Sequence, residues 1–397
     1  MPLVFVHGVG TREGPGFEES VAARDALFRR FMLARALPDP SAVTISNPYW
    51  GRHGARPAWG HASLPGDPVE ALGPEDEELA MVGAPILQER PLDEPPLLGA
   101  ARRSLEEAVD LLWATASEES GAGSADELAA LAVRAVDYAR NEPDRSWLDE
   151  VETDQEFVSE LEKRVDAWSP VGASSADDEP AYEALGAAES WARIGEAADR
   201  IRGFVGRLAG RAVLEVARAP AHRGTATVLG DILVYLRERG TADAPGDIVT
   251  EVAGALDAAR DAVTPEDPRL IVVTHSMGGN IVYDLLTHFR RDLEVDLLVT
   301  VGSQVSFFEE LKLFVESRGD VPVTPATDRV PRPENAGRWI NIFDRNDVLS
   351  FAAEGVFGGV EDYEYSTGKG LLFAHTTYFL RPSFHDRLGE RVAGPAR

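Results

Sequence analysis

The residues best suited to do chemistry lie around Ser276, in the stretch 269–280. The apolar, β-branched run 270–273 predicts a strand buried on both faces, and apolar residues recur at helical spacing from Ile281 onward. A serine in a sharp turn between a strand and a helix has the geometry of a nucleophile elbow. The N-terminus of the helix then points at the serine, where it stabilises developing negative charge.

Glycines after the serine make such a turn feasible. A Cβ at Gly278 or Gly279 would collide with the incoming strand, so we expect the turn to need both glycines. The elbow pattern is G-x-S-x-G, and Thr274 stands at its first glycine position. We expect the threonine to crowd the turn slightly without abolishing it.

Other polar residues follow predicted strands. Strand 3–6 leads into His7, Gly8, Val9 and Gly10, a glycine-rich loop that can turn a backbone N–H toward the serine. Later strands are predicted at 297–301, 338–343 and 362–365, with helices between several of them. Strands alternating with helices predict a parallel, doubly wound sheet, whose functional residues lie at the carboxyl ends of the strands.

A serine nucleophile needs a base, and the base needs an orienting carboxylate. Two aspartates, Asp344 and Asp347, follow strand 338–343, and both are candidates for the carboxylate. Two histidines, His375 and His385, follow the last strand and compete for the role of base, and we favour His375. No cysteine is present, and no histidine has a partner at metal-ligand spacing, so the sequence predicts neither a metal nor a cofactor.

Further residues near the predicted sheet edge have supporting roles. Tyr49 and Trp50 follow strand 43–46 and are candidates to line a substrate pocket, although such aromatic residues are more often part of a core. His7 and His275 flank the two turns, and we expect them to brace the loops rather than to transfer protons.

The formal net charge of the 397-residue chain is −28. So acidic a surface repels phosphate backbones, which excludes nucleic acid as a partner and argues against membrane docking through basic patches. Peripheral contact with a membrane stays open. No apolar run is long enough to span a bilayer, and no signal-peptide pattern precedes strand 3–6, so a cytoplasmic location is expected. The oligomeric state cannot be read from the sequence.

The middle of the chain differs from its ends. Residues 67–200 hold 34 acidic and 10 basic side chains, which accounts for 24 of the 28 excess negative charges. Proline, glycine and acidic residues at 56–100 predict a long loop, and helical patterns follow, the last over 183–217. We therefore expect residues 1–55 and 220–397 to form an α/β core, with 56–219 as an acidic, mainly helical cap inserted into it.

The chain resembles the α/β-hydrolase superfamily in its lipase and esterase branch. The matching segments are 4–10, 273–279, 299–303 and 344–347, together with His375. The resemblance covers both ends of the chain but not the cap. It implies an α/β-hydrolase fold, with Ser276 as nucleophile and His375 as general base. It favours Asp347 as the triad acid, because an apolar residue follows it as in the family pattern, and it keeps Asp344 as the alternative. The oxyanion hole would be the N–H of Met277 with that of Val9 or Gly8.

The resemblance further implies a serine hydrolase that cleaves carboxylic esters through an acyl-enzyme. A large cap shields an acyl pocket from water, which favours an ester or lipid-like small-molecule substrate. An amidase, a peptidase or an acyltransferase would use the same triad. A non-catalytic module that binds a protein partner through its acidic cap is the alternative from another class.

Overall fold

A six-stranded parallel sheet forms the centre of the molecule, in the strand order β10-β8-β6-β5-β1-β2. The computed structural model describes residues 2–14, 17–37, 39–63, 95–117, 125–142, 144–168, 184–208, 212–264, 269–368 and 374–394. The predicted parallel α/β architecture is confirmed. The strands are β1 (Leu3–Val6), β2 (Ile45–Ser46), β5 (Ile271–His275), β6 (Val295–Val301), β8 (Ala336–Phe343) and β10 (Val360–Glu364).

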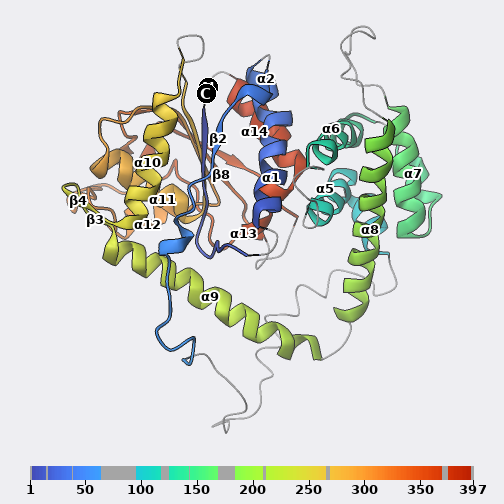
Figure 1. Ribbon diagram of the computed structural model, residues 1–397, viewed down its shortest axis with the longest axis horizontal. Helices are drawn as coiled ribbons and strands as arrows, with labels where there is room; N and C mark the ends of the chain where they lie inside the picture. The colour runs from blue at the N-terminus through green and yellow to red at the C-terminus, as the bar shows by residue number, and fades with distance from the viewer. Residues whose placement is uncertain are drawn as a thin grey trace.

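The central strands are buried on both faces, as their unbroken apolar runs predict. Alternate residues of β5 belong to two different cores: Val272 to one, and Ile271 and Val273 to the other. Figure 1 shows helices on both sides of the sheet. One side carries α10 (Asp247–Asp261), α11 (Met277–Asp284) and α12 (Val305–Glu310), and the other carries α1 (Phe17–Leu27) and α14 (Pro382–Ala393).

Short elements connect these layers. The helix predicted from residue 18 to 37 is α1 followed by a π-helix and a final short turn, so its regular α-helical part is shorter than expected. The short helical elements are η1 (Phe28–Leu33), α2 (Ala34–Ala36), η2 (Pro40–Ala42), η3 (Trp50–His53), η5 (Ser146–Asp149), η6 (Leu285–Phe289), α13 (Ala374–Thr377) and η7 (Tyr378–Leu380). Two small two-stranded sheets pair β3 (Gly240–Thr241) with β4 (Ala244–Pro245) and β7 (Val330–Pro331) with β9 (Phe357–Gly358).

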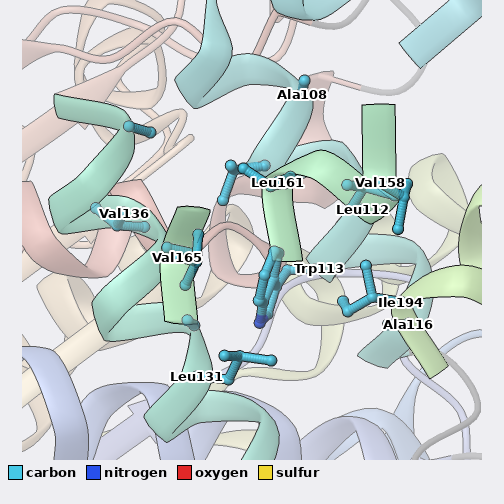
Figure 2. Packing of buried hydrophobic residues seen from close by; sticks show 14 of the residues in the cluster. Ala108, Leu112, Trp113, Ala116, Leu131, Val136, Val158, Leu161, Val165 and Ile194 are labelled. Atoms are coloured by element: carbon cyan, nitrogen blue, oxygen red, sulfur yellow. The ribbon is translucent and has the colours of Figure 1, made fainter. Parts of the chain in front are cut away.

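A group of helices from the middle of the chain has a hydrophobic core of its own, centred on Trp113, Leu131 and Leu161 (Figure 2). Ala26 and Phe31 of the α1–η1 segment belong to the same core, so these helices pack against the helix layer of the sheet. The group comprises α4 (Pro96–Arg103), α5 (Leu105–Ser117), α6 (Ala125–Asn141), α7 (Asp154–Ala167) and α8 (Ala184–Leu208), and we call it the helical layer. Most of the loop predicted over 56–100, residues 64–94, lies outside the described residues, and the prediction is wrong from Pro96 onward, where α4 begins.

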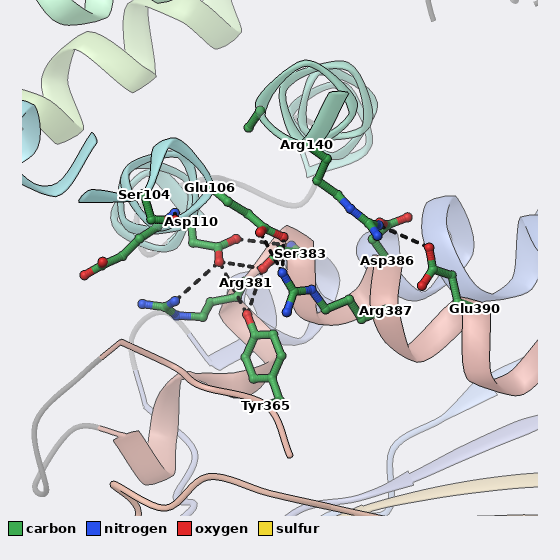
Figure 3. Close-up of polar contacts among 12 residues, drawn as sticks. Ser104, Glu106, Asp110, Arg140, Tyr365, Arg381, Ser383, Asp386, Arg387 and Glu390 are labelled. Carbon is green, nitrogen blue, oxygen red and sulfur yellow. Dashed lines mark hydrogen bonds and ion pairs between the residues drawn. The ribbon is translucent and has the colours of Figure 1, made fainter. Parts of the chain in front are cut away.

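Buried polar contacts bind the helical layer to the end of the chain (Figure 3). Asp110 of α5 accepts hydrogen bonds from Ser383 Oγ at 2.6 Å and Ser383 N at 3.1 Å, and it forms an ion pair with Arg381 at 3.3 Å. Arg140 of α6 forms an ion pair with Asp386 of α14. Because η7 and α14 directly follow the helix that carries His375, the helical layer is fixed next to that part of the chain.

A long helix, α9 (Ala212–Glu238), connects the helical layer to the sheet (Figure 1). The single helix predicted over 183–217 is therefore two helices, α8 and α9, and α9 runs through the expected cap boundary at residue 219. The last turns of α9 pack on the sheet side, where Tyr235 is buried. None of the helices in the described ranges is long and apolar enough to cross a membrane.

Candidate active site

Ser276 occupies a strained turn between β5 and α11. Its φ of 52° and ψ of −126° are a combination that residues with a Cβ rarely adopt. Two hydrogen bonds fix this backbone: Ser276 N donates to Val301 O at 2.9 Å, and Ser303 Oγ donates to Ser276 O at 3.1 Å. The strand, turn and helix expected from the sequence are therefore present at this serine.

Close approach of backbones explains the glycine after the turn. A Cβ on Gly278 would lie 2.3 Å from Val6 O, which is on the neighbouring strand β1 rather than on the incoming strand β5. The expected collision is real, but its partner was misassigned. Thr274, at the first glycine position of the elbow pattern, is fully buried, and its Oγ1 donates to Val299 O at 3.2 Å.

Ser276, His375 and Asp347 meet at the carboxyl edge of the sheet. His375 Nε2 lies 2.8 Å from Ser276 Oγ, and His375 Nδ1 lies 2.8 Å from Asp347 Oδ2. Since a carboxylate can only accept, Nδ1 donates to Asp347, and Nε2 is left to accept the hydroxyl proton of Ser276. Tyr378 OH and Leu349 N also donate to Asp347, at 3.0 and 2.9 Å, and fix its carboxylate.

The two competing residues have other partners. Asp344 accepts hydrogen bonds from Thr367 N and Thr367 Oγ1, both at 2.6 Å, and thereby fixes the loop that follows β10. His385 is fully buried in α14 among aromatic rings, and its Nε2 donates to Phe379 O at 3.0 Å. Between the alternatives left by the sequence, the geometry therefore favours Asp347 and His375.

Ser276 lies at the topological switch point of the sheet. From β1 the chain continues to β2 on one side, whereas β5 continues to β6 on the other, so the crevice between the ends of β1 and β5 is where ligands bind in such sheets. A Cβ on Gly8 would lie 2.6 Å from Ser276 Cβ and 3.2 Å from Ser276 Oγ. Only glycine therefore allows the loop after β1 to approach the serine this closely.

The N–H groups expected to form the oxyanion hole flank this crevice. Within the part of the chain that the structure describes, the backbone N–H groups of Gly8 and Val9 have no hydrogen-bond acceptor. Met277 is fully buried at the first position of α11, where helical N–H groups have no partner within the helix. Free N–H groups beside a hydroxyl can bind an oxyanion. Gly8 and Val9 both remain candidates for the second donor.

The two flanking histidines brace loops. His275 Nε2 donates to His375 O at 2.7 Å, and burial lowers the pKa of His275 to about 3, so it is neutral at physiological pH. His7 Nδ1 donates to Gly8 O at 2.8 Å, and burial lowers its pKa to about 4. Each neutral ring therefore fixes the backbone of one candidate catalytic loop.

The two aromatic candidates for pocket lining have structural contacts. Trp50 is fully buried, stacks on His7 with ring centroids 4.9 Å apart, and donates from Nε1 to His7 O at 2.8 Å. The structure therefore places Trp50 in the core, the alternative role that the sequence left open for such aromatic residues. Tyr49 is half-buried, and its hydroxyl accepts from Glu13 N at 2.7 Å, so it fixes the loop after β1.

Gln304 is a site residue that the sequence did not single out. Its Nε2 lies 3.4 Å from Ser276 Oγ and donates to Gly302 O and Leu349 O, which hold the amide beside the serine. The sequence feature that could have identified Gln304 is its position in the loop after β6, at the same sheet edge as Ser276. Nothing in the pattern distinguished it from an ordinary loop residue.

Comparisons of the whole chain with known proteins identify no relative. No protein-family model matches the chain, and searches of curated proteins and of solved structures find no match either.

The geometry of the site allows proton transfer from a nucleophile. His375 Nε2 can take the Ser276 proton as Oγ attacks an electrophilic carbon, and Asp347 stabilises the imidazolium that forms. The serine is only 1% exposed, so water has little access to its hydroxyl in this conformation. A shielded hydroxyl with an oriented base is suited to attack on a bound acyl group.

Proposed function

We propose that this chain is a serine hydrolase of the α/β-hydrolase superfamily that cleaves carboxylic esters through an acyl-enzyme. The observation that carries the proposal is the pair of 2.8 Å contacts that His375 makes with Ser276 Oγ and Asp347 Oδ2. The strained serine at the end of β5 and the close approach of Gly8 support it, because both are features of a nucleophile elbow with an oxyanion loop beside it.

The reaction would run in two steps, acylation of Ser276 and deacylation by water. Ser276 Oγ attacks the ester carbonyl carbon, His375 takes the hydroxyl proton, and that proton then passes to the leaving alkoxide, which departs as an alcohol. Water next attacks the acyl carbon and gives a proton to His375, which passes it to Ser276 Oγ as the acyl–oxygen bond breaks, so the carboxylic acid leaves and Ser276 regains its hydroxyl. The N–H groups of Met277 and of Gly8 or Val9 would bind the negative oxygen in both steps.

Apolar side chains near the triad support an apolar acyl group. Phe307 of α12 stacks on Phe351 with ring centroids 4.9 Å apart, and Phe307 is 38% exposed. Val348, which follows the triad aspartate directly, is 59% exposed. We call Phe307, Phe351 and Val348 the apolar rim. Burying such side chains against a substrate chain contributes about 0.8 kcal/mol per methylene group.

A fluorophosphonate probe tests the mechanism, because it phosphonylates only an activated serine. We expect labelling of the intact protein at Ser276, located by mass spectrometry of the labelled peptide. Ser276→Ala should abolish labelling, and His375→Gln should slow it at least 100-fold, as expected for loss of a general base.

Ser146→Ala is the matched control, because it removes an exposed serine hydroxyl of η5 in the helical layer. Equal labelling of wild type and Ser276→Ala would refute the proposal. Hydrolysis of p-nitrophenyl esters of increasing chain length then separates the alternatives. If Ser276 is labelled but none of the esters is hydrolysed, an amidase, a peptidase or an acyltransferase would be favoured. Failure to label at all would favour the non-catalytic, partner-binding module.

A further inference from the structure

A buried carboxylate, Asp231 of α9, lies next to the loop that follows β1. It accepts four hydrogen bonds, from Gly10 N at 2.8 Å, Ala55 N at 2.7 Å, and Arg12 Nη1 and Nη2 at 3.0 and 2.6 Å. The side chain is fully buried, whereas Arg12 is one-third exposed. A carboxylate that accepts from a bidentate arginine and two backbone N–H groups has a single well-defined position.

The surrounding chain is shaped to allow this contact. A Cβ on Gly54 would lie 2.5 Å from Asp231 Oδ1 and 2.6 Å from Arg12 Nη2. A residue with a Cβ at position 54 would therefore have to displace the end of one of these two side chains. Three segments that are far apart in the sequence, the loop at 10–12, the turn at 54–55 and helix α9, thus meet at one carboxylate.

The same loop presents the candidate oxyanion donors. Thr11 Oγ1 donates to Gly8 O at 3.2 Å. Because of this hydrogen bond, a displacement of residues 10–12 also displaces Gly8. Gly8 in turn lies against Ser276, and the N–H groups of Gly8 and Val9 have no acceptor among the described residues. A shift of Gly10 and Arg12 would therefore move these N–H groups relative to Ser276 Oγ.

Helix α9 also binds the other half of the site. Tyr235 lies four residues after Asp231, on the same face of the helix, and its hydroxyl donates to Asp284 Oδ2 at 2.9 Å. Arg239 forms an ion pair with the same oxygen at 2.8 Å. Asp284 ends α11, the helix that begins directly after Ser276. One face of α9 thus contacts both the loop after β1 and the elbow helix.

We propose that Asp231 is a positioning residue that fixes the loop 8–12 so that its free backbone N–H groups face the oxygen that becomes negative during attack by Ser276. The inference rests on the proposed function, because it assigns a role within that reaction. It differs from a purely structural role in one respect. Loss of the contact should weaken binding of the transition state much more than binding of the substrate.

Asp231→Asn tests the proposal, because asparagine keeps the shape but loses the charge that binds Arg12. We expect kcat on a p-nitrophenyl ester to fall about 10- to 100-fold with KM changed less than about 2-fold, since a misplacement of about 1 Å in a catalytic group has effects of this size. A boronic acid becomes a tetrahedral anion on the serine, and its affinity should fall by the same factor as kcat/KM.

Asp154→Asn is the matched control. Asp154 is also a buried carboxylate that accepts from two backbone N–H groups, those of Leu97 and Leu98, but it lies in the helical layer. We expect this variant to lose thermal stability while keeping kcat and boronate affinity. If Asp231→Asn does not fold, Arg12→Lys replaces it, because lysine keeps the charge but cannot bind both carboxylate oxygens in parallel.

The outcomes separate the two hypotheses. Wild-type kcat and boronate affinity in a folded Asp231→Asn or Arg12→Lys variant would overturn the positioning role and leave the proposed function intact. A parallel rise in KM and loss of stability without a fall in kcat would also overturn it, because that pattern indicates a structural role only. Absence of fluorophosphonate labelling in the wild type would overturn the proposed function, and the inference with it.

Discussion

At the scale of single residues, the site combines one strained backbone with several neutral, buried side chains. Strain such as that at Ser276 costs about 1–3 kcal/mol and persists only where surrounding contacts enforce it. Those contacts come from Val301 and Ser303 at the end of β6 and from Gly8 after β1. The serine is thus held between its two neighbouring strands before any substrate binds.

Three buried histidines should make folding stability depend on pH. Burial lowers the pKa of His275 and His385 to about 3 and that of His7 to about 4. In the unfolded chain each of these histidines has a pKa of about 6.5 and binds a proton below that pH. In the native state the same side chains stay neutral until the pH approaches their lowered pKa values. Their contribution to stability is therefore fully present above pH about 6.5 and is lost as the pH falls from there toward about 4 for His7 and about 3 for His275 and His385.

His385→Gln isolates one of these residues. Glutamine can still donate to Phe379 O but takes up no proton, so we expect the free energy of unfolding to fall less steeply with acidification. The slope between pH 6 and 4.5 should decrease by about 1.4 kcal/mol per pH unit, the contribution of one proton. Urea titrations at several pH values measure it. Identical slopes in wild type and variant would show that His385 is protonated in the native state.

Residue types and spacing single out Ser276 as the candidate nucleophile and favour Asp347 and His375 as its partners, but they leave Asp344 and His385 as alternatives. Asp344 and Asp347 both follow β8, and what separates them is contact with Thr367 in one case and with His375 in the other. Those contacts depend on how the loop after β10 folds back. Asp231 lies 221 residues from Gly10 in sequence, so no local pattern connects the two.

At the scale of secondary-structure elements, strands were easier to predict than the placement of helices. The residues of β1 are all apolar, and β5 is apolar from Ile271 to Val273, so a strand buried on both faces suits each run. Amphipathic helices such as α5 and α6 reveal which face is buried but not what covers it. The sequence therefore predicted the helices of the helical layer except α4, but not that the layer packs against α1, η1 and α14.

The contact between α5 and the C-terminal segment should depend on one buried ion pair. Asp110 and Arg381 are each at most 3% exposed. Burial raises the pKa of Asp110, while the positive charge of Arg381 and the hydrogen bonds from Ser383 act to lower it. Asp110→Asn leaves the Arg381 guanidinium buried without a counter-charge. We expect the free energy of unfolding to fall by about 3–5 kcal/mol, measured by urea denaturation at neutral pH.

Glu106→Gln provides the comparison within the same helix. Glu106 pairs with Arg387 of α14, but the Arg387 side chain is 48% exposed, so solvent screens the pair. We expect this variant to lose about 0–1 kcal/mol. If both variants lost the same free energy of unfolding, the buried Asp110–Arg381 pair would contribute no more than an exposed pair to the contact of α5 with η7 and α14.

At the scale of the whole molecule, the net charge of −28 acts on any charged substrate that approaches the site. A field of one sign raises the local concentration of the opposite charge and increases its association rate by about 10-fold or more. The guanidinium of Arg12, in the loop 8–12, is paired with the Asp231 carboxylate. We therefore expect the long-range field, rather than a local cation, to decide between charged esters.

A matched pair of esters tests this expectation. Both carry the same acyl chain, one with a trimethylammonium and one with a sulfonate group on the alcohol, and a neutral ester serves as control. At about 20 mM salt, kcat/KM for the cationic ester should exceed that for the anionic ester about 10-fold. At about 0.5 M salt the Debye length shrinks from about 20 Å to about 4 Å, so the ratio should approach one while the neutral ester is unaffected. Preference for the anionic ester at low salt would show that positive groups close to Ser276 outweigh the charge of the whole chain.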